Sequence, residues 1–430
     1  MNSRLNPDES RADRRLKNLI DVNQHFAEIE SLEELFPLML DLAKHITEAE
    51  AASLLLYNPG ENVLEFVSIT DDSLDNEKKQ ILRDTIKIKI GEGIAGRVAK
   101  DRCPLMVDDT QNDERFLVSV DKKTGFLTRN LLSVPLLHND ELLGVLNVLN
   151  SIKKNAFDLE DQELLLGYSY LASVAIIRSR LIESRLAQQR LETQLTTAAK
   201  IQSLFWPKIP ELGQGSHVWA VSEPAAFVGG DLYDFIPLPD GSWVMYVADV
   251  SDKGLPAAMI MVALWSKIRS EVLLYRDLES FLTSINNSMY DLLHEEGFFA
   301  TVVMGQYWPG TGKLSIVRGG HPFPLLIRNG GVIEVDDTEG ISLGVVRNAA
   351  YVRSDIILSP GESIIFFSDG VTEAENQQRV QFGHHRSIKC LTEKRDLPRS
   401  FALLDEIMNW QQTSDQNDDL TILEIWREAE

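Results

Sequence analysis

Apolar residues recur at helical spacing between Leu16 and Ile46, with an interruption just before Ser31. This pattern predicts two consecutive helices, the second of them capped by Ser31. Short runs with the composition of β-strands follow at residues 52–57, 63–69, 105–107, 131–136 and 142–149. Two dipeptides between these runs predict hairpin turns, Pro59-Gly60 and Asn139-Asp140.

A much longer helix is predicted from about Asp158 to Phe205. Its middle, residues 178–200, is rich in Arg, Gln, Glu and Leu and contains no Gly or Pro, as a long exposed helix requires. Pro207 ends it. Strand-like runs and Gly-rich turns alternate through the second half of the chain, where helices are predicted at residues 256–275 and 278–295.

The composition limits the classes of partner. The chain has 430 residues, enough for two or three domains, and its 42 Lys and Arg against 65 Asp and Glu give a formal charge of −23. Such a charge opposes binding to nucleic acid or anionic lipid, so we expect neither as a partner. The longest strongly apolar run, residues 255–265, is shorter than the roughly 20 residues of a membrane-spanning helix. The first residues lack the apolar core of a signal peptide, so we expect a cytoplasmic protein.

Four aspartates share one local setting, because each lies where a strand-like run meets a turn or beside such a run. They are Asp231, Asp249, Asp369 and Asp418. Strand ends that meet at one edge of a sheet would gather these carboxylates, which raise one another's pKa values within about 4 to 6 Å unless a cation neutralises them. Oxygen ligands favour Mg²⁺ or Mn²⁺ over zinc. The pattern therefore predicts a site that can hold two such ions, activate a water molecule and bind phosphoryl oxygens.

Each aspartate lies in a distinctive segment that is longer than a turn alone would require. These segments are GGDLYDF (229–235), ADVSDKGLPAAM (248–259), FFSDGVTEAEN (366–376) and NDDLTILEI (417–425). In this order and spacing the segments resemble the metal-dependent protein phosphatase (PPM) superfamily, in its SpoIIE- and RsbU-like bacterial branch. RGGHPFPLL (318–326) and AAKIQSLFWP (198–207) add to the resemblance. The family implies a serine/threonine phosphatase with an αββα sandwich, whose two antiparallel sheets hold the metal site between them at one edge.

The resemblance also implies a role for each residue that matches the family's motifs. Asp249 would bridge two ions, Mn²⁺ or Mg²⁺, and the carbonyl of Val250 would bind one of them. Asp369 and Asp418 would complete the shell of the first ion, and Asp231 would serve the second, directly or through water. The nucleophile would be a metal-bound water held by Asp249 and Asp369, so no side-chain nucleophile is expected.

Three departures from the family pattern bear on the site. Asp252 stands where many relatives have glycine, and it would either ligate a further ion or cap the helix that starts at Pro256; the cap is the preferred interpretation. Asp419 stands where distant relatives carry asparagine, so either Asp418 or Asp419 could be the ligand, and the match of the whole segment favours Asp418. Residues 222–230 contain no arginine of the kind that anchors phosphate in eukaryotic relatives, so the metal ions alone are expected to hold the phosphate.

Two segments of the first half resemble a GAF domain: IKIGEGIAGRVAKDRCPLMVDD (88–109) and LLSVPLLHNDELLGVLNVLN (131–150). The family implies an antiparallel sheet between helices, and its members often hold a small ligand on one face of that sheet. We therefore expect a sensor domain with a site for a small molecule, whose identity the sequence leaves open.

Some GAF domains that bind cyclic nucleotides carry an Asn-Lys, Phe and Asp-Glu motif. Asn150, Phe157 and Asp161 match this motif and are the candidate ligand-binding residues of the sensor, whereas Ser151 and Gln162 replace its lysine and glutamate. The lost ion pair disfavours a cyclic nucleotide. We expect the three matching residues to pin the loop before the last helix of the domain.

A stripe of residues at steps of three and four follows the predicted linker helix. Its members are Ile177, Leu181, Ser184, Gln188, Leu191, Leu195 and Ala198. Because polar residues interrupt it, the stripe predicts a weak coiled-coil seam and a homodimer. A solvated spacer helix is the alternative.

Together these features predict an α+β chain with four parts: an N-terminal tail (1–14), a GAF-like sensor (15–177), a helical linker (178–206) and a phosphatase domain (207–430). The resemblance implies that the sensor regulates dephosphorylation of a small anti-sigma-factor antagonist in a partner-switching pathway. The alternatives are a pseudophosphatase that only docks a partner protein, and a complex in which the sensor occludes the site. Retention of the four aspartates argues against a decayed site.

Overall fold

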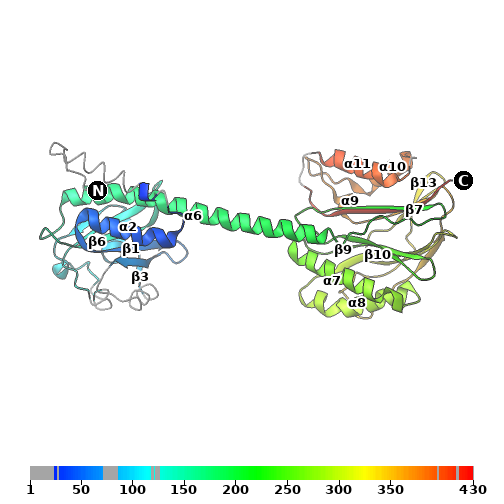
Figure 1. The fold of residues 1–430 in the computed structure, drawn as a ribbon, viewed down its shortest axis with the longest axis horizontal. Coiled ribbons are helices and arrows are strands. Elements are labelled where there is room, and N and C mark those ends of the chain that lie inside the picture. Colours follow the sequence, from blue (N-terminus) through cyan, green and yellow to red (C-terminus); the bar gives the residue numbers. More distant parts are fainter. Residues whose placement is uncertain are drawn as a thin grey trace, which may run out of the picture. The chain divides into compact units, whose positions relative to one another are not determined.

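The computed structural model describes residues 24–26, 29–70, 86–117, 121, 126–394, 397–412 and 416–429. The chain divides into two compact units, Met1–Arg190 and Leu191–Glu430. Each unit combines antiparallel sheet with helices (Figure 1), which confirms the α+β class. The first of the two predicted N-terminal helices lies mostly outside the described residues, and residues 24–26 are helical within it.

The first unit is built on one six-stranded sheet with the order β3-β2-β1-β6-β5-β4. Its strands are β1 (Ala49–Asn58), β2 (Val63–Thr70), β3 (Lys87–Lys89), β4 (Leu105–Val107), β5 (Leu131–His138) and β6 (Glu141–Ser151). All five strand-like runs of the sequence are therefore strands, and the predicted turns join β1 to β2 and β5 to β6. Asn139 and Asp140 have φ angles of 47° and 64°, the left-handed conformation that favours this kind of tight hairpin.

Helices cover both faces of this sheet. α2 (Leu32–Thr47) and the first part of α6 (Leu159–Gln202) pack on one face, and α4 (Gly93–Asp101) packs on the other. A short 3-10 helix, η1 (Thr110–Asn112), follows β4. Ser31 caps α2, as predicted, because its side chain accepts a hydrogen bond from the amide of Glu34 at 3.3 Å.

Among the described helices, α6 alone is long and apolar enough to meet the length and composition of a membrane span, with a mean hydropathy of 1.2 over its best window. However, 44% of that window is buried, and Leu165, Tyr168 and Ile176 of α6 belong to the core shared with α2. The Tyr168 hydroxyl donates a hydrogen bond to the carbonyl of Met39 in α2 at 2.6 Å. A core helix therefore accounts for this apolar window, and the absence of a membrane partner stays a prediction.

The second unit is a sandwich of two five-stranded antiparallel sheets, ordered β14-β11-β10-β9-β8 and β13-β12-β15-β16-β7. The first sheet contains β8 (Leu232–Pro237), β9 (Trp243–Val250), β10 (Ala300–Trp308), β11 (Lys313–Gly319) and β14 (Ser354–Ile357). The second contains β7 (Ser216–Glu223), β12 (Leu325–Arg328), β13 (Gly331–Glu334), β15 (Ser363–Phe367) and β16 (Leu420–Arg427).

Helices cover the outer face of each sheet of the sandwich (Figure 1). The first sheet carries α7 (Leu255–Glu271), η2 (Val272–Leu274) and α8 (Leu278–Glu295). The second carries α9 (Gly370–Glu373), α10 (Gly383–Glu393) and α11 (Arg399–Gln411). This order of layers is the αββα sandwich that the resemblance implies.

Alternate residues of each central strand face different layers. In β9, Tyr246 and Ala248 pack against the layer of α7 and α8, whereas Met245 and Val247 lie in the core between the two sheets. The next residue in the second set is Asp249. The period of the strand therefore directs this carboxylate into the space between the sheets.

Candidate metal centre and sensor cavity

The strand register places Asp231 opposite Asp249. β8 and β9 pair antiparallel with Leu232 opposite Ala248, so the next pair along is Asp231 and Asp249. Val247, two residues before Asp249, lies in the core between the sheets. Because residues directly opposite one another lie on the same face of a sheet, both carboxylates face that core.

The second sheet meets this pair of aspartates through Ser368. The Ser368 hydroxyl donates a hydrogen bond to Asp231 Oδ2 at 2.6 Å and accepts one from the amide of Thr421 at 2.9 Å. Asp369 follows Ser368 directly at the end of β15, and Asp418 lies two residues before β16. The four predicted ligands therefore come from strand ends of both sheets.

Burial and like charge raise the pKa values of these carboxyl groups. Asp231 is only 2% exposed, and burial, followed by the charges of Asp249 and Asp419, raises its pKa well above the usual range. Burial, followed by the charges of Asp369 and Asp418, raises the pKa of Asp249 to about 7. Among the described residues, no group donates a hydrogen bond to Asp231 Oδ1. A buried carboxyl oxygen is thus left without a hydrogen-bond partner, which is costly in an apolar interior.

The donor set fits a hard divalent cation. All of its side-chain donors are carboxylate oxygens, which Mg²⁺ and Mn²⁺ prefer, and a cation would compensate Asp231 Oδ1. The backbone approaches closely here, because a Cβ on Gly230 would lie 2.7 Å from the carbonyl oxygen of Val250. Within the described ranges, no three Asp, Glu, His or Cys side chains are yet arranged to hold an ion. Ligation therefore requires the side chains to rearrange.

Asp418 and Asp419 have different partners. Asp419 is 6% exposed and accepts hydrogen bonds from the amides of Ala225 at 2.7 Å and Gly230 at 2.6 Å, so it holds the loop before β8. Asp418 is more exposed, and its Oδ2 lies 3.1 Å from Lys253 Nζ. Because the backbone amides occupy Asp419, whereas the Asp418 carboxylate bonds, within the described ranges, to an exposed lysine side chain and its own neighbour, Asp418 is the better candidate for a metal ligand.

The sensor residues singled out from the sequence make contacts within the fold. Asn150 accepts a hydrogen bond from the amide of Arg129 at 2.7 Å, and Phe157 packs in the core with α2 and α6. Asp161 pairs with Lys154 at 3.1 Å. None of the three is among the described residues that line the apolar cavity on the α4 side of the sheet, and the structure places them in and beside the loop that joins β6 to α6.

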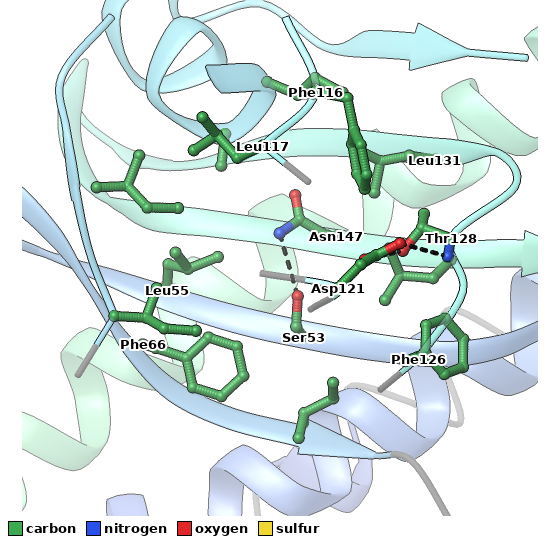
Figure 2. A pocket seen from close by; sticks show the side chains of 16 residues that line it. Ser53, Leu55, Phe66, Phe116, Leu117, Asp121, Phe126, Thr128, Leu131 and Asn147 are labelled. Carbon is green, nitrogen blue, oxygen red and sulfur yellow. Dashed lines mark hydrogen bonds between the residues drawn. The ribbon is translucent and has the colours of Figure 1, made fainter. Parts of the chain in front are cut away.

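A cavity of about 90 Å³ lies on the α4 side of the sheet in the first unit (Figure 2). Its described wall is mostly apolar and includes Leu55, Phe66, Phe116 and Leu131. Two groups of polar side chains also line the cavity. Asn147 donates a hydrogen bond to Ser53 Oγ at 3.1 Å, and the carboxylate of Asp121 accepts two from Thr128, both at 2.8 Å. No Lys, Arg or His belongs to this part of the wall.

Comparisons with known proteins agree with this architecture. Residues 239–428 match the family model of stage II sporulation protein E (SpoIIE), and residues 30–177 match that of the GAF domain. The chain joins a GAF domain to a SpoIIE-type, PP2C-like phosphatase domain.

Protein IcfG of Synechocystis sp. (strain ATCC 27184 / PCC 6803 / Kazusa) is 27% identical over 307 residues, which are 64% of this chain and 48% of that protein. Phosphoserine phosphatase RsbU of Bacillus subtilis (strain 168) is 26% identical over 192 residues, 44% of this chain and 56% of that protein. The chain thus spans about half the length of these relatives. Among solved structures, the SiaA-PP2C domain of Pseudomonas aeruginosa has a TM-score of 0.49 and 20% identity, and the match covers 56% of this chain and 98% of that one.

Asp252 of the phosphatase domain does not cap α7, so the preferred interpretation of this residue is wrong. The N-cap of α7 is Gly254, and no side chain bonds there. Asp252 has a φ of 71° and accepts a hydrogen bond from the adjacent amide of Lys253 at 2.9 Å. Pro256 in the first turn lacks an N–H group, which removes one of the donors that a side-chain cap would satisfy.

The sequence did not reveal the partner of Gln202, the last residue of α6. Its Nε2 donates a hydrogen bond to the carbonyl of Gly229 at 2.6 Å, and its Oε1 accepts one from the amide of the same glycine at 3.1 Å. A Cβ on Gly229 would lie 2.4 Å from Asp419 Oδ2. The backbone at Gly229 and Gly230, directly before Asp231, is therefore held between Gln202 and Asp419.

The raised pKa of Asp249 predicts that the stability of the metal-free phosphatase domain depends on pH. A carboxyl group whose pKa is higher in the folded than in the unfolded state stabilises the fold while it is protonated. This contribution is complete below about pH 4 and is lost as the pH rises through about 7. We expect the midpoint of thermal unfolding in EDTA to fall by several degrees between about pH 5 and pH 8. Mn²⁺ should reverse the fall.

Calorimetry of the full chain measures this midpoint, and Asp249→Asn is the matched variant because asparagine does not ionise. The variant should show a smaller fall over the same pH range. An equal fall in the variant and the wild type would contradict the role given to Asp249.

Proposed function

We propose that this chain is a cytoplasmic serine/threonine phosphoprotein phosphatase that depends on Mn²⁺ or Mg²⁺ and is regulated by its GAF domain. The observation that carries the proposal is the group of buried carboxylates between the two sheets, with the uncompensated Oδ1 of Asp231 among them. The match to the SpoIIE family model and the similarity to a protein named phosphoserine phosphatase support the same activity.

Four aspartates and one carbonyl group would hold two ions: Asp231, Asp249, Asp369, Asp418 and the carbonyl of Val250. When bound, the ions supply a nucleophilic water at neutral pH and stabilise charge on the phosphoryl group. The water oxygen forms a bond to phosphorus, the bond from phosphorus to the seryl or threonyl oxygen breaks, and that oxygen takes up a proton.

The residues around the ligands position this chemistry. Ser368 orients Asp231 through its hydrogen bond to Oδ2, and Asp419 and Gln202 fix the backbone of the loop that precedes Asp231. Burial keeps bulk water from Asp231, which strengthens the electrostatic interactions of its carboxylate. No side-chain nucleophile is needed.

We further propose that the substrate is a small phosphorylated anti-sigma-factor antagonist in a partner-switching pathway. The similarity to RsbU supports this assignment, and the formal charge of −23 favours a protein over a nucleic acid as the partner. The alternative is a pseudophosphatase that docks a partner without turnover. Buried carboxylates with raised pKa values destabilise a fold unless a cation binds them, so their retention argues for a working site.

Phosphate release from phosphoserine and phosphothreonine proteins should require Mn²⁺ or Mg²⁺ and stop in EDTA. Asp249→Asn and Asp369→Asn should each lower turnover by at least about 100-fold at saturating metal, because each removes charge from a ligand. Asp240→Asn is the matched control, since Asp240 lies in the turn at the other end of the β8–β9 hairpin. It should keep wild-type turnover.

Two results would contradict the assignment. One is activity that persists in EDTA when the measured metal content is nil. The other is near-wild-type turnover in either ligand variant while circular dichroism shows that the variant is folded.

For the GAF domain we propose a small, mostly apolar ligand without negative charge. The apolar wall favours such a molecule, and the Ser53–Asn147 pair offers it hydrogen-bonding groups. An anion would lose its hydration in this apolar wall, to which the described residues contribute no cation. These features disfavour a cyclic nucleotide, whose phosphate group is anionic.

Ring compounds that differ in charge test this proposal. Benzyl alcohol and benzylamine should raise the unfolding midpoint of the full chain at millimolar concentration, whereas benzoate, cyclic AMP and cyclic GMP should not, because only the latter three are anions. Differential scanning fluorimetry measures the shifts. Tight binding of either cyclic nucleotide, or a shift by benzoate equal to that by benzyl alcohol, would sink the idea.

We also propose that α6 pairs with its copy in a homodimer. Leu181 is 65% exposed and Leu191 is 55% exposed, and each such side chain contributes about 1.5 to 3 kcal/mol when it becomes buried. Ser184 and Gln188 weaken the seam, which suits a helix that shifts on signalling. The contact of Gln202 with Gly229 would carry such a shift to the loop before Asp231.

Two variants distinguish the pairing of α6 in a dimer from the transfer of its movement to the loop before Asp231. The double variant Leu191→Asp with Leu195→Asp should lower the sedimentation mass from near twice 48.4 kDa toward the monomer and abolish the response to a GAF ligand. Gln202→Ala should keep the dimer and lose the response. A wild-type monomer at micromolar concentration, or an unchanged response in both variants, would show that α6 is only a spacer.

A further inference from the structure

One lysine faces the carboxylates of the candidate metal centre. Lys253 lies in the loop between β9 and α7, where its Nζ is 3.1 Å from Asp418 Oδ2 and donates a hydrogen bond to the carbonyl of Asn417. Burial is the largest influence on Asp369 and raises its pKa, and the charge of Lys253 acts in the opposite direction. Across the described ranges, no other Lys, Arg or His forms an ion pair with the aspartates of this centre.

The loop fixes the backbone of Lys253 and leaves its ammonium group able to move. Asp252 accepts a hydrogen bond from the Lys253 amide, and Ser251 is tied to Phe299 by two hydrogen bonds of 2.9 Å. The Lys253 side chain is nevertheless 49% exposed. Its flexible four-carbon stem can carry the ammonium group from Asp418 to a molecule bound beside the carboxylates.

The charge of the loaded centre shows why a further cation matters, a step that rests on the proposed function. Four aspartate ligands carry −4 and two divalent ions carry +4, so the centre is neutral before a substrate binds. A phosphate monoester approaches a dianion at pH 7, and Asp419 adds a negative charge nearby. Residues 222–230 supply no arginine to offset it.

We propose that Lys253 is the phosphate-binding cation of this site. Before a metal ion is present, its ammonium group neutralises Asp418. Once Asp418 ligates a divalent cation, the ammonium group moves to the phosphoryl oxygens of the substrate. This revises the expectation that the metal ions alone hold the phosphate. Removal of the lysine therefore has two opposite effects: phosphate binding weakens and metal binding tightens.

The full chain and three variants test the proposal. Lys253→Met should raise KM for a phosphoserine protein and the inhibition constant of inorganic phosphate by at least about tenfold, because a charge-assisted hydrogen bond is lost, and should change kcat less than about threefold. Mn²⁺ titrated by calorimetry in the absence of substrate should bind at least about threefold more tightly, since the competing cation is gone. Lys253→Arg should restore phosphate binding.

Lys267→Met is the matched control, because Lys267 also pairs with a carboxylate, that of Glu271 at 2.6 Å, but does so within α7. It should behave as the wild type. Unchanged KM and phosphate inhibition in Lys253→Met, or Mn²⁺ affinity that is unchanged or weaker, would overturn the proposal. If the wild type releases no phosphate from any phosphoprotein, the proposed function fails instead. Calorimetric titration of inorganic phosphate into the Mn²⁺-loaded chains then decides the role of Lys253.

Discussion

Repulsion between buried carboxylates is the constraint on which the phosphatase domain depends. The antiparallel register of β8 and β9 sets Asp231 against Asp249, and the packing of a second sheet brings Asp369 and Asp418 to the same edge. A protein that gathers such groups must protonate them or bind a cation. The raised pKa values describe the first state, and the oxygen donors suit the second. The two sheets therefore meet at an edge whose energy depends on how the charge of these carboxyl groups is neutralised.

The residues that hold this edge together are distinct from those that would bind ions. Asp419 accepts backbone hydrogen bonds from the loop before β8, and Ser368 joins the two sheets through its hydrogen bond to Asp231. Gln202, at the end of α6, forms hydrogen bonds with the backbone of Gly229. A movement of α6 would therefore act on the backbone before Asp231 through Gln202, which bonds to Gly229 and to no carboxylate of the candidate metal centre. Under the proposed regulation, this separation would let the geometry of the centre change while its charge stays constant.

Local patterns in the sequence were sufficient to predict most helices, strands and strand ends, because each of these depends on residues that are close together in the chain. Five of the six strands of the GAF domain, the Ser31 cap and the positions of the four aspartates follow from such patterns, whereas the three-residue strand β3 was too short to give one. Contacts between distant residues could not be predicted in the same way. Gln202 meets Gly229 and Lys253 meets Asp418 only because the sandwich folds. Asp252 shows how a local pattern can mislead, since a residue type that favours helix caps lies two residues before the actual N-cap, Gly254.

Side chains that alternate between the two faces of β6 offer a physical link between the GAF cavity and α6. Asn147 of β6 faces the cavity, whereas its neighbours Leu146 and Val148 face the core that α2 and α6 share. Because successive residues of a strand lie on opposite faces, a ligand that pulled on Asn147 would also displace the side chains that pack against α6. Packed cores resist gradual deformation and shift between discrete arrangements. Under the proposed regulation, a small ligand would therefore move α6 by acting on the other face of the sheet, without touching the helix.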